Sequence, residues 1–361
     1  MEPKLSLNQN LLFPVLILSG FSLIILRSVD PVALEQQLIF LLMGVIFFII
    51  FSQFNYHIFT HLSWWLYVLV VIFLSLTFFL GTTTRGSIRW IQIGQFGLQP
   101  SEFAKPLLIL FASSLLTKTN IRRLPNLLMS LGLFTIPIFL IFKQPDLGSS
   151  LVVVAIVISL LIASKIKFTH SLLLTLPLLA SFPFLWNFLK TYQQQRIITF
   201  LNPFVDPLGS GYNALQSMIA VGSGKLFGKG LGHGTQSQLR FLPERQTDFI
   251  FASLAEELGF VGSFIVIITY IWLLWSIISA AQKAKSQQGS LIIIGVFTMF
   301  LFQFTVNIGM NLGLFPITGI TLPFISAGGS SLIASFISLG LVQNVCSSLY
   351  HPKPELELGR D

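Results

Sequence analysis

The sequence predicts an all-α integral membrane protein with about ten transmembrane helices, both termini in the cytoplasm, and one large extracytoplasmic loop with a short interfacial helix. Of the 361 residues, 53% are hydrophobic and 9% are charged, and the mean hydropathy is +0.82. Soluble domains carry about 25% charged residues. The composition therefore excludes a soluble domain, and we expect residues 1–361 to form a single polytopic membrane domain.

Ten apolar runs support the span count, because most are near or above the ~20 residues that cross a bilayer. They are Leu11–Leu26, Leu38–Phe54, Trp64–Leu80, Phe103–Leu116, Leu124–Phe142, Leu147–Ala163, Phe168–Leu189, Phe249–Ala280, Leu291–Leu314 and Leu322–Leu349. The first run lacks an early cleavage signature and is followed directly by further runs. We therefore expect a retained anchor and not a removed signal peptide.

Lys and Arg in the short loops set the orientation, because they favour the cytoplasmic side. With the N-terminus inside, the inside segments hold Lys4, Lys118, Arg122, Arg123, Lys165, Lys167, Lys283, Lys285, Lys353 and Arg360. The short outside loops hold only Arg27, Arg85, Arg89 and Lys143. The formal net charge of +8 thus reflects topology and requires no nucleic-acid partner.

The large segment at about 190–247 lies outside in this topology. Loops of this length are usually functional. The helical spacing of Leu215, Met218 and Ile219 predicts a short helix at the membrane interface.

A glycine-rich run, Gly222–Gly234, follows that helix and contains Lys225 and Lys229. Free backbone N–H groups and two ammonium groups would suit a phosphate or pyrophosphate. The alternative is a pliable connector without a ligand.

Asp248 stands where the polar loop gives way to an apolar run, so we expect it in the first turn of a membrane helix. A carboxylate is favoured there, because free N–H groups and the positive end of the helix dipole point at it. Glu256 would lie about 80° round and roughly 12 Å deeper, with Glu257 on the opposite face. Asp248 is either a cap or a functional group.

Glu102 and Lys105 begin another run and are three residues apart, so they share one helix face. Charged groups at the edge of the hydrocarbon must be paired or face a wet cavity, and they are candidates for function. A structural ion pair is the alternative. Asp146 and Arg196 are expected on the same outer side, so charged groups gather at one end of the protein.

The tract from Asn307 to Ser331 is uncharged and rich in Gly, Pro and Ser. Such a composition is typical of a broken helix or re-entrant loop, which the membrane tolerates only where it lines a protein cavity. Close helix packing through small residues is the competing interpretation. Its hydrogen-bonding groups are Asn307, Asn311, Ser326, Ser330 and Ser331.

Cysteine and histidine usage argues against two kinds of site. The single cysteine, Cys346, excludes an intramolecular disulfide and a multi-cysteine metal site. The five histidines lack ligand spacing, so we expect no zinc site.

Five stretches carry specific motifs: WIQIGQFGLQPSEFAKP, QPDLGSSL, RIITFLNPFVDPLGSGYNALQSMIAVGSGKLFGKG, HGTQSQLRFLPERQTDFIFASLAEELGFVG and FPITGITLPFISAGGSSL. In this order they resemble the SEDS family, the shape, elongation, division and sporulation proteins of bacteria. The resemblance covers nearly the whole chain. The run HGTQSQLRFLPERQTDF is more similar to the elongation members than to the division members.

The resemblance implies a peptidoglycan glycosyltransferase that polymerises lipid II at the outer face of the bacterial cytoplasmic membrane during elongation. It implies two kinds of partner: a class B penicillin-binding protein that supplies the transpeptidase, and membrane proteins of the elongation complex. Asp248 matches the family's essential aspartate, and Glu102 with Lys105 match its buried acid and base. Gln246 stands where relatives usually have His, which excludes that His as a proton relay.

Lipid II carries an α-linked sugar pyrophosphate and the glycan is β-1,4-linked, so one displacement with inversion is the simplest route. It needs a base for the attacking 4-hydroxyl, assigned to Asp248, and charge to stabilise the departing pyrophosphate. That charge could come from Lys105, Arg196, Lys225 or Lys229, or from Mg²⁺ or Mn²⁺, although no metal motif is visible. Other expected substrate contacts are Glu102, which would orient Lys105, and Gln236, Thr247 and Ser330.

Other functions stay open. A transporter that flips lipid-linked precursors would also need intramembrane charges and a broken helix. A membrane scaffold that positions partner enzymes is a third class, and a division-type polymerase is the alternative within the family.

Overall fold

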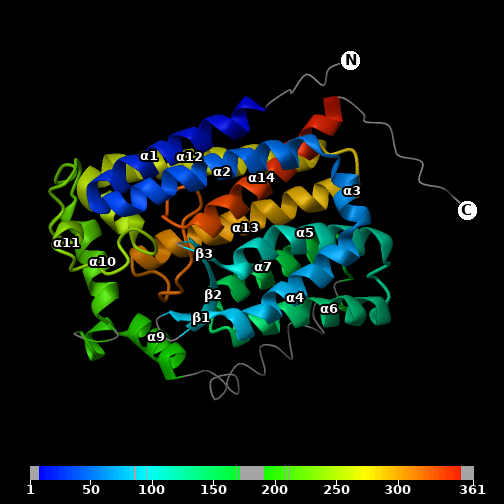
Figure 1. Cartoon of the computed structure of the whole chain (residues 1–361), viewed down its shortest axis with the longest axis horizontal. Coiled ribbons are helices and arrows are strands. Elements are labelled where there is room, and N and C mark those ends of the chain that lie inside the picture. The colour runs from blue at the N-terminus through cyan, green and yellow to red at the C-terminus, as the bar shows by residue number, and fades with distance from the viewer. Residues whose placement is uncertain are drawn as a thin grey trace, which may run out of the picture.

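The computed structural model describes residues 8–84, 87–94, 96–167, 169–170, 191–207, 209 and 211–350. In these ranges long helices pack side by side, and most of the short elements lie at one end (Figure 1). The long helices are α1 (Gln9–Val29), α2 (Pro31–Gln53), α4 (Ser63–Leu80), α5 (Pro100–Lys118), α6 (Leu124–Lys143), α7 (Leu147–Ala163), α12 (Ile250–Lys283), α13 (Gln287–Asn311) and α14 (Gly329–Tyr350). The shorter elements are α3 (Tyr56–His61), α9 (Thr191–Leu201), η2 (Pro203–Val205), α10 (Tyr212–Ser223) and α11 (Thr235–Gln238).

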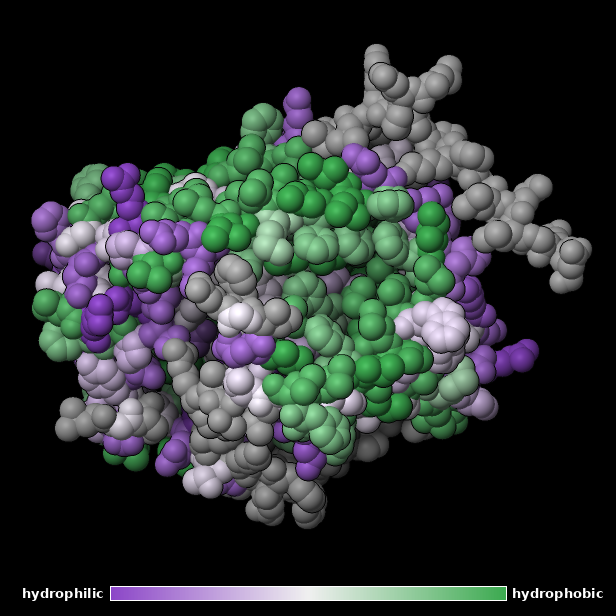
Figure 2. Space-filling model, in the orientation of Figure 1, coloured by the Kyte–Doolittle hydropathy of each residue, from purple (hydrophilic) through white to green (hydrophobic). Residues whose placement is uncertain are grey.

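Seven of the described helices, α1, α2, α4, α6, α12, α13 and α14, are long and apolar enough to cross a membrane. α7 is a shorter apolar helix, and α5 carries Glu102 and Lys105 near its start. Figure 2 shows hydrophobic side chains over the middle of one face and hydrophilic ones toward both ends. The protein is therefore a multi-pass membrane protein. Of the expected run Phe168–Leu189 only residues 169–170 are described, so the total of ten spans stays a prediction.

The core is built around α14. Of its apolar window 94% is buried, against 17% for α2, which leaves most of α2 to face lipid. Small residues allow the close approach of these two helices. Gly44 of α2 leaves room for the ring of Phe336, and a Cβ at Gly340 would lie 2.9 Å from the carbonyl oxygen of Phe48.

The two ends of the bundle are chemically different. We call the end at which α1, α4, α6 and α13 finish and α2, α5, α7, α12 and α14 begin the loop end, and the opposite one the far end. At the loop end, Ser28 donates to Glu257 (2.7 Å) and Gln99 donates to Asp146 (2.8 Å). The predicted gathering of charged residues at one end is confirmed for Glu102, Asp146 and Asp248, which all lie there.

The expectation of a purely helical protein is wrong at one place. Thr82–Thr84 (β1), Ser87–Ile93 (β2) and Phe96–Leu98 (β3) form a three-stranded antiparallel sheet, β1-β2-β3, where we expected a short outside loop. The sequence has β-branched and aromatic residues here and a turn at Gly94, which has a positive φ of 63°. Arg85 lies outside the described residues.

The long loop contains the short helix that we predicted, α10, but its buried face is different. Ala214, Ser217 and Ala220 are buried, whereas the larger Ile219 is exposed. Ile219 thus points away from the protein, as in an interfacial helix, whereas Met218 packs against Gly313. α9 precedes α10 and is a second helix in the long loop, which we did not predict.

The break in the apolar tract is confirmed. α13 ends at Asn311 and α14 begins at Gly329, and residues 312–328 between them are not helical. Much of this break is buried, including Leu322, Phe324 and Ile325. Small-residue packing is present too, because a Cβ at Gly148 would lie 2.9 Å from the carbonyl oxygen of Thr318.

Candidate functional site

Asp248 lies in a turn just before α12, and not in its first helical turn as we expected. The helix begins at Ile250, with Phe249 as an N-cap that forms no side-chain cap hydrogen bond. The reason is a tight turn in which Thr247 and Phe249 both donate their N–H groups to the carbonyl oxygen of Glu244 (both 3.1 Å). Glu244 has a positive φ of 51°. The backbone therefore reaches helical geometry only after Asp248.

Two buried asparagines of α13 hold the Asp248 backbone. Asn307 and Asn311 each donate from Nδ2 to the carbonyl oxygen of Asp248 at 3.1 Å. Asn311 also accepts the N–H of Ala252 at Oδ1 (3.1 Å), so a neighbouring helix caps the start of α12. From sequence we named these asparagines only as general hydrogen-bonding groups of the tract. Their spacing of four residues, which puts both on one helix face, was the available signal.

The broken tract clamps the same segment from the other side. Ser326 donates to the carbonyl oxygen of Thr247 (2.7 Å), and the N–H of Ala327 donates to that of Gln246 (2.9 Å). A Cβ at Gly319 would lie 3.5 Å from Oδ2 of Asp248, and Gly319 has a positive φ of 74°. The carboxylate therefore lies against the tract, where a glycine leaves space.

A cavity of about 260 Å³ borders this segment. Its lining includes Asp30, Gln36, Gln37, Trp90, Gln246 and Thr247. Amide and carboxylate groups beside an aromatic ring suit a polar ligand with an apolar face, such as a sugar. The contributions of α2 were not predicted; the polar residues Glu35, Gln36 and Gln37 before an apolar run were the signal.

Arg245, next to this cavity, is tied to the end of α1. Its guanidinium donates from Nε and Nη2 to the carbonyl oxygen of Val29 (3.3 and 3.2 Å). Burial lowers the pKa of Arg245, and Arg240 lowers it further, whereas Asp30 raises it. Arg245 is thus engaged in holding the loop to the bundle.

Asp146 and Ser330 belong to a second polar cluster at the loop end. Asp146 accepts from Gln99 (2.8 Å), Ser101 (2.9 Å) and the N–H of Ser149 (3.1 Å), and Arg89 lies 3.9 Å away. Ser330 accepts the N–H of Gln99 at 3.0 Å. These contacts join β2, α5, α7 and α14. Asp146 is therefore a poor candidate for a base, because its lone pairs are already engaged.

Glu102 and Lys105 form the expected ion pair on one face of α5. Nζ of Lys105 lies 2.6 Å from Oε1 of Glu102, and the two residues are 1% and 6% exposed. The pairing is confirmed. The catalytic role of the pair stays a prediction.

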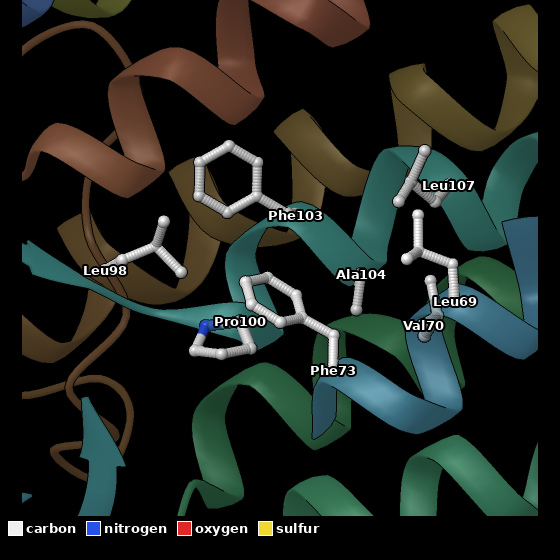
Figure 3. A pocket seen from close by; sticks show the side chains of 8 residues that line it. All are labelled: Leu69, Val70, Phe73, Leu98, Pro100, Phe103, Ala104 and Leu107. Carbon is white, nitrogen blue, oxygen red and sulfur yellow. The ribbon is translucent and has the colours of Figure 1, made fainter. Parts of the chain in front are cut away.

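The opposite face of α5 lines a different hollow, with a volume of about 340 Å³ (Figure 3). Phe73 of α4 and Pro100, Phe103 and Ala104 of α5 are among its lining residues. At helical spacing these α5 residues lie roughly 180° from the ion pair. Since the lining is apolar, this hollow does not suit a sugar or a pyrophosphate.

Glu256 is completely buried and holds the loop that precedes Asp248. It accepts from Nζ of Lys229 (2.9 Å), from the N–H groups of Gln236 (2.9 Å) and Ser237 (3.0 Å), and from the hydroxyls of Ser237 and Thr235. Lys229 and Gln236 are thus gathered around Glu256. This cluster lies two turns along α12 from Asp248, roughly 12 Å away.

The glycine-rich run does not offer the free N–H groups that we expected. α12 is interrupted at Gly259, whose φ of 69° and ψ of −163° are not helical. The N–H groups of Lys229 and Gly230 donate to the carbonyl oxygens of Glu256 and Glu257 (both 3.0 Å). The carbonyl oxygen of Lys225 accepts the N–H of Phe260 (2.8 Å). The run therefore supplies hydrogen-bond partners for the backbone groups that the break in α12 leaves unpaired. Inside a membrane protein such groups must be paired within the protein. The connector interpretation accounts for these contacts.

Arg196 lines a third cavity, of about 340 Å³, between α9, α10 and the beginning of the broken tract. Phe200, Met218, Phe315 and Ile317 also line it. The tract continues from Ile317 to Gly319, beside Asp248. The structure thus brings together Asp248, Thr247 and the tract, with Arg196 farther along it; Lys225, Lys229 and Gln236 lie around the α12 break.

No group of three or more His, Cys, Asp or Glu side chains with metal-binding geometry occurs in the part of the chain that the structure describes. Asp146 and Glu256 are already saturated with donors. In the described residues no cluster of three such ligands is available to hold a cation without help from a substrate.

A family model of cell cycle proteins, FtsW/RodA/SpoVE, matches residues 7–351. The chain belongs to this family. The peptidoglycan glycosyltransferase MrdB of Escherichia coli K12 is 36% identical over 95% of this chain and 94% of its own length. The stage V sporulation protein E of Bacillus subtilis is 39% identical over 86% of both chains.

Solved structures agree with this assignment. A chain of a peptidoglycan synthase complex that coordinates polymerization and crosslinking superposes with a TM-score of 0.82 at 30% identity, covering 96% of this chain and 99% of that one. The rod shape determining protein RodA of Thermus thermophilus superposes with a TM-score of 0.73 at 28% identity over 96% and 99%. The fold of this chain is the fold of its family.

Proposed function

We propose that this protein polymerises lipid II into β-1,4 glycan strands at the outer face of the cytoplasmic membrane, with Asp248 as the general base. The chain is an enzyme, a peptidoglycan glycosyltransferase of the SEDS family, in line with its family and with relatives of that name. Lipid II, the role of Asp248 and the side of the membrane are the parts that we add.

The observation that carries the proposal is the firmly held backbone of Asp248, which directly follows Gln246 and Thr247 in the lining of a polar cavity. The carbonyl oxygens of Gln246, Thr247 and Asp248 all accept hydrogen bonds from α13 or the broken tract, so this backbone segment is held on two sides. A general base must be positioned within hydrogen-bond reach of the proton that it removes. A backbone position that is fixed in this way suits a general base better than it suits a residue that merely caps a helix.

In the proposed step, Asp248 takes the proton of the acceptor's 4-hydroxyl group. The oxygen of that hydroxyl group attacks the anomeric carbon of the donor at the same time. The bond from that carbon to the pyrophosphate breaks, and the configuration inverts. Asp248 ends protonated and the lipid pyrophosphate leaves as an anion. The balance requires no oxidant and no second co-reactant.

Of the four cations that we predicted, Arg196 is best placed to stabilise the negative charge on the leaving group. Lys105 is paired with Glu102, and Lys229 is paired with Glu256. Lys225 is exposed at the α12 break. Arg196 lines a cavity formed by the same tract that touches Asp248. The proposed mechanism assigns no step to Mg²⁺ or Mn²⁺, and a divalent cation held partly by the substrate pyrophosphate stays a prediction.

The finer biological role is elongation and rod shape, served together with a class B penicillin-binding protein and membrane proteins of the elongation complex. Support comes from RodA among the solved structures and from the synthase complex that combines polymerization with crosslinking. The sporulation relative at 39% identity shows that this likeness is shared among branches, so division is the alternative role. The inner membrane is the proposed location.

The test is polymerisation by the purified protein in detergent with lipid II as the substrate and no second compartment. An enzyme forms glycan chains, which lysozyme then digests. A precursor flippase forms none, but it moves labelled lipid II across vesicle membranes. Product that forms only after the partner is added supports an enzyme that needs activation, and absence of product under both conditions contradicts the proposal.

A further inference from the structure

A hollow at the far end of the bundle, opposite Asp248, belongs to none of the features above. Its volume is about 520 Å³, and it lies where α5 and α7 finish and α13 begins. The polar lining residues are Thr119, Asn120, Arg122, Ser164, Lys165 and Gln287, together with Thr117. Ligand sites commonly have volumes of roughly 300–1,000 Å³.

Ser164 is only 9% exposed, and its buried hydroxyl has no hydrogen-bond partner among the described atoms. The other lining hydroxyls are engaged: Thr117 donates to the carbonyl oxygen of Ser113 (2.9 Å), and Thr119 to that of Leu115 (2.6 Å). A buried, unpaired polar group is costly, and a ligand acceptor would remove that cost.

The charge around the hollow is strongly positive. Lys118, Arg122, Arg123, Lys165 and Lys167 lie at or near its rim and are all exposed. Every aspartate and glutamate of the described ranges lies toward the loop end instead. Helix ends do not alter this balance, because the negative ends of α5 and α7, about half a charge each, are offset by the positive ends of α6 and α13.

Apolar side chains border the same place. Ile162, one turn before Lys165, is 64% exposed, and Leu128, one turn into α6, is 53% exposed. In a membrane protein such residues face acyl chains. The hollow therefore lies where the hydrocarbon meets the headgroups.

We propose that this hollow binds the phosphate of an anionic phospholipid headgroup. The Ser164 hydroxyl, the Arg122 guanidinium and the Lys165 ammonium supply donors, and Ile162 and Leu128 lie beside the acyl chains. A lipid is favoured over a soluble phosphate because the basic residues and the exposed apolar residues are contiguous. The inference is independent of the proposed function, because it concerns the opposite membrane surface and requires no turnover.

The experiment measures lipid retention by native mass spectrometry on the delipidated full chain, titrated with phosphatidylglycerol or phosphatidylcholine. The main variant is Ser164→Ala, which changes no charge. The second is Arg122→Gln with Lys165→Gln, and its matched control is Lys283→Gln with Lys285→Gln, which removes the same charge elsewhere at the far end.

We expect phosphatidylglycerol to bind in preference to phosphatidylcholine. In the proposed site Arg122 and Lys165 each donate a charged hydrogen bond to the phosphate, so their variant should bind about 100-fold more weakly, whereas the Lys283/Lys285 variant loses only diffuse attraction and should change less. Loss of one hydrogen bond should make Ser164→Ala about fivefold weaker. Equal losses in the Arg122/Lys165 and Lys283/Lys285 variants, with Ser164→Ala unchanged, would show diffuse attraction and overturn the site. Competition by inorganic phosphate as strong as that by the lipid would overturn its assignment to lipid.

Discussion

Asn311 donates a 3.1 Å hydrogen bond to the carbonyl oxygen of Asp248, and its own Oδ1 accepts the N–H of Ala252 at 3.1 Å. One side chain of α13 thus fixes both the residue before α12 and the first turn of that helix. Ser217 of α10 donates to the carbonyl oxygen of Asn311 (3.0 Å), which extends the network to the long loop. The position of the proposed base depends on this network.

Asn311→Ala should lower kcat by about 10²-fold, because a shift of roughly 1 Å at a reacting group costs that much. It should change KM little. Asn344 is the matched control, since it is equally buried and also accepts an N–H (Tyr56, 3.2 Å) and donates to carbonyl oxygens, but at the far end. Both variants should lose about 1–3 kcal/mol of stability. Equal kcat values in the two variants would reduce Asn311 to a structural residue.

Glu102→Ala should leave Lys105 as an unpaired charge in the membrane and destabilise the protein by about 3–5 kcal/mol. The double change Glu102→Gln with Lys105→Met should restore the thermal stability, because it removes both charges. If the pair serves the reaction, the stable double variant should still fail to polymerise lipid II. Full activity in that variant would show that the pair only joins helices.

Lys229→Ala should destabilise the loop that precedes Asp248, because Lys229 is paired with the buried Glu256. We expect a loss of about 1–2 kcal/mol, since Glu256 keeps its other donors, together with faster proteolysis of residues 225–240. Lys225→Ala, an exposed position with the same charge, should change neither quantity. A raised KM for lipid II with unchanged stability would instead assign Lys229 to the substrate.

The orientation can be tested with single cysteines in a Cys346→Ala background. Asp206→Cys should react with an impermeant maleimide added to spheroplasts, and Lys285→Cys should react only after the membrane is opened. Both positions are exposed in the structure, so accessibility within the protein does not limit either. The reverse pattern would contradict the orientation drawn from the short-loop cations.

Much of the fold could be predicted because the membrane imposes simple rules. Apolar runs near ~20 residues gave the spans, and helix breakers gave the non-helical tract at 312–328. The sheet at Thr82–Leu98 was missed, since short extramembrane strands leave only a weak periodicity. The start of α12 was placed early, because the tight turn at Glu244 depends on contacts with the distant Ser326 and Ala327.

The charged residues of the site could be predicted from the sequence, but most of the groups that they contact could not. Lys105 pairs with Glu102 because helical spacing alone brings them together. Lys229 pairs with Glu256, 27 residues away, and the glycines between them serve the break at Gly259. Long-range pairing of this kind leaves no local signal. The asparagines of α13 also act on a carbonyl oxygen more than 50 residues away, and their spacing of four residues indicates a shared helix face but not this partner.

The most direct measurement is the rate of lipid II polymerisation by purified Asp248→Asn. Asparagine has nearly the same size and can still accept hydrogen bonds at Oδ1, but it takes no proton at neutral pH. The backbone clamp from Asn307 and Asn311 is unaffected, so the variant should keep its melting temperature and lose about 10²- to 10⁴-fold in rate. Asp248→Glu should fall between the two. Polymerisation by Asp248→Asn at a rate near that of the unmodified protein would contradict the assignment of Asp248 as the base.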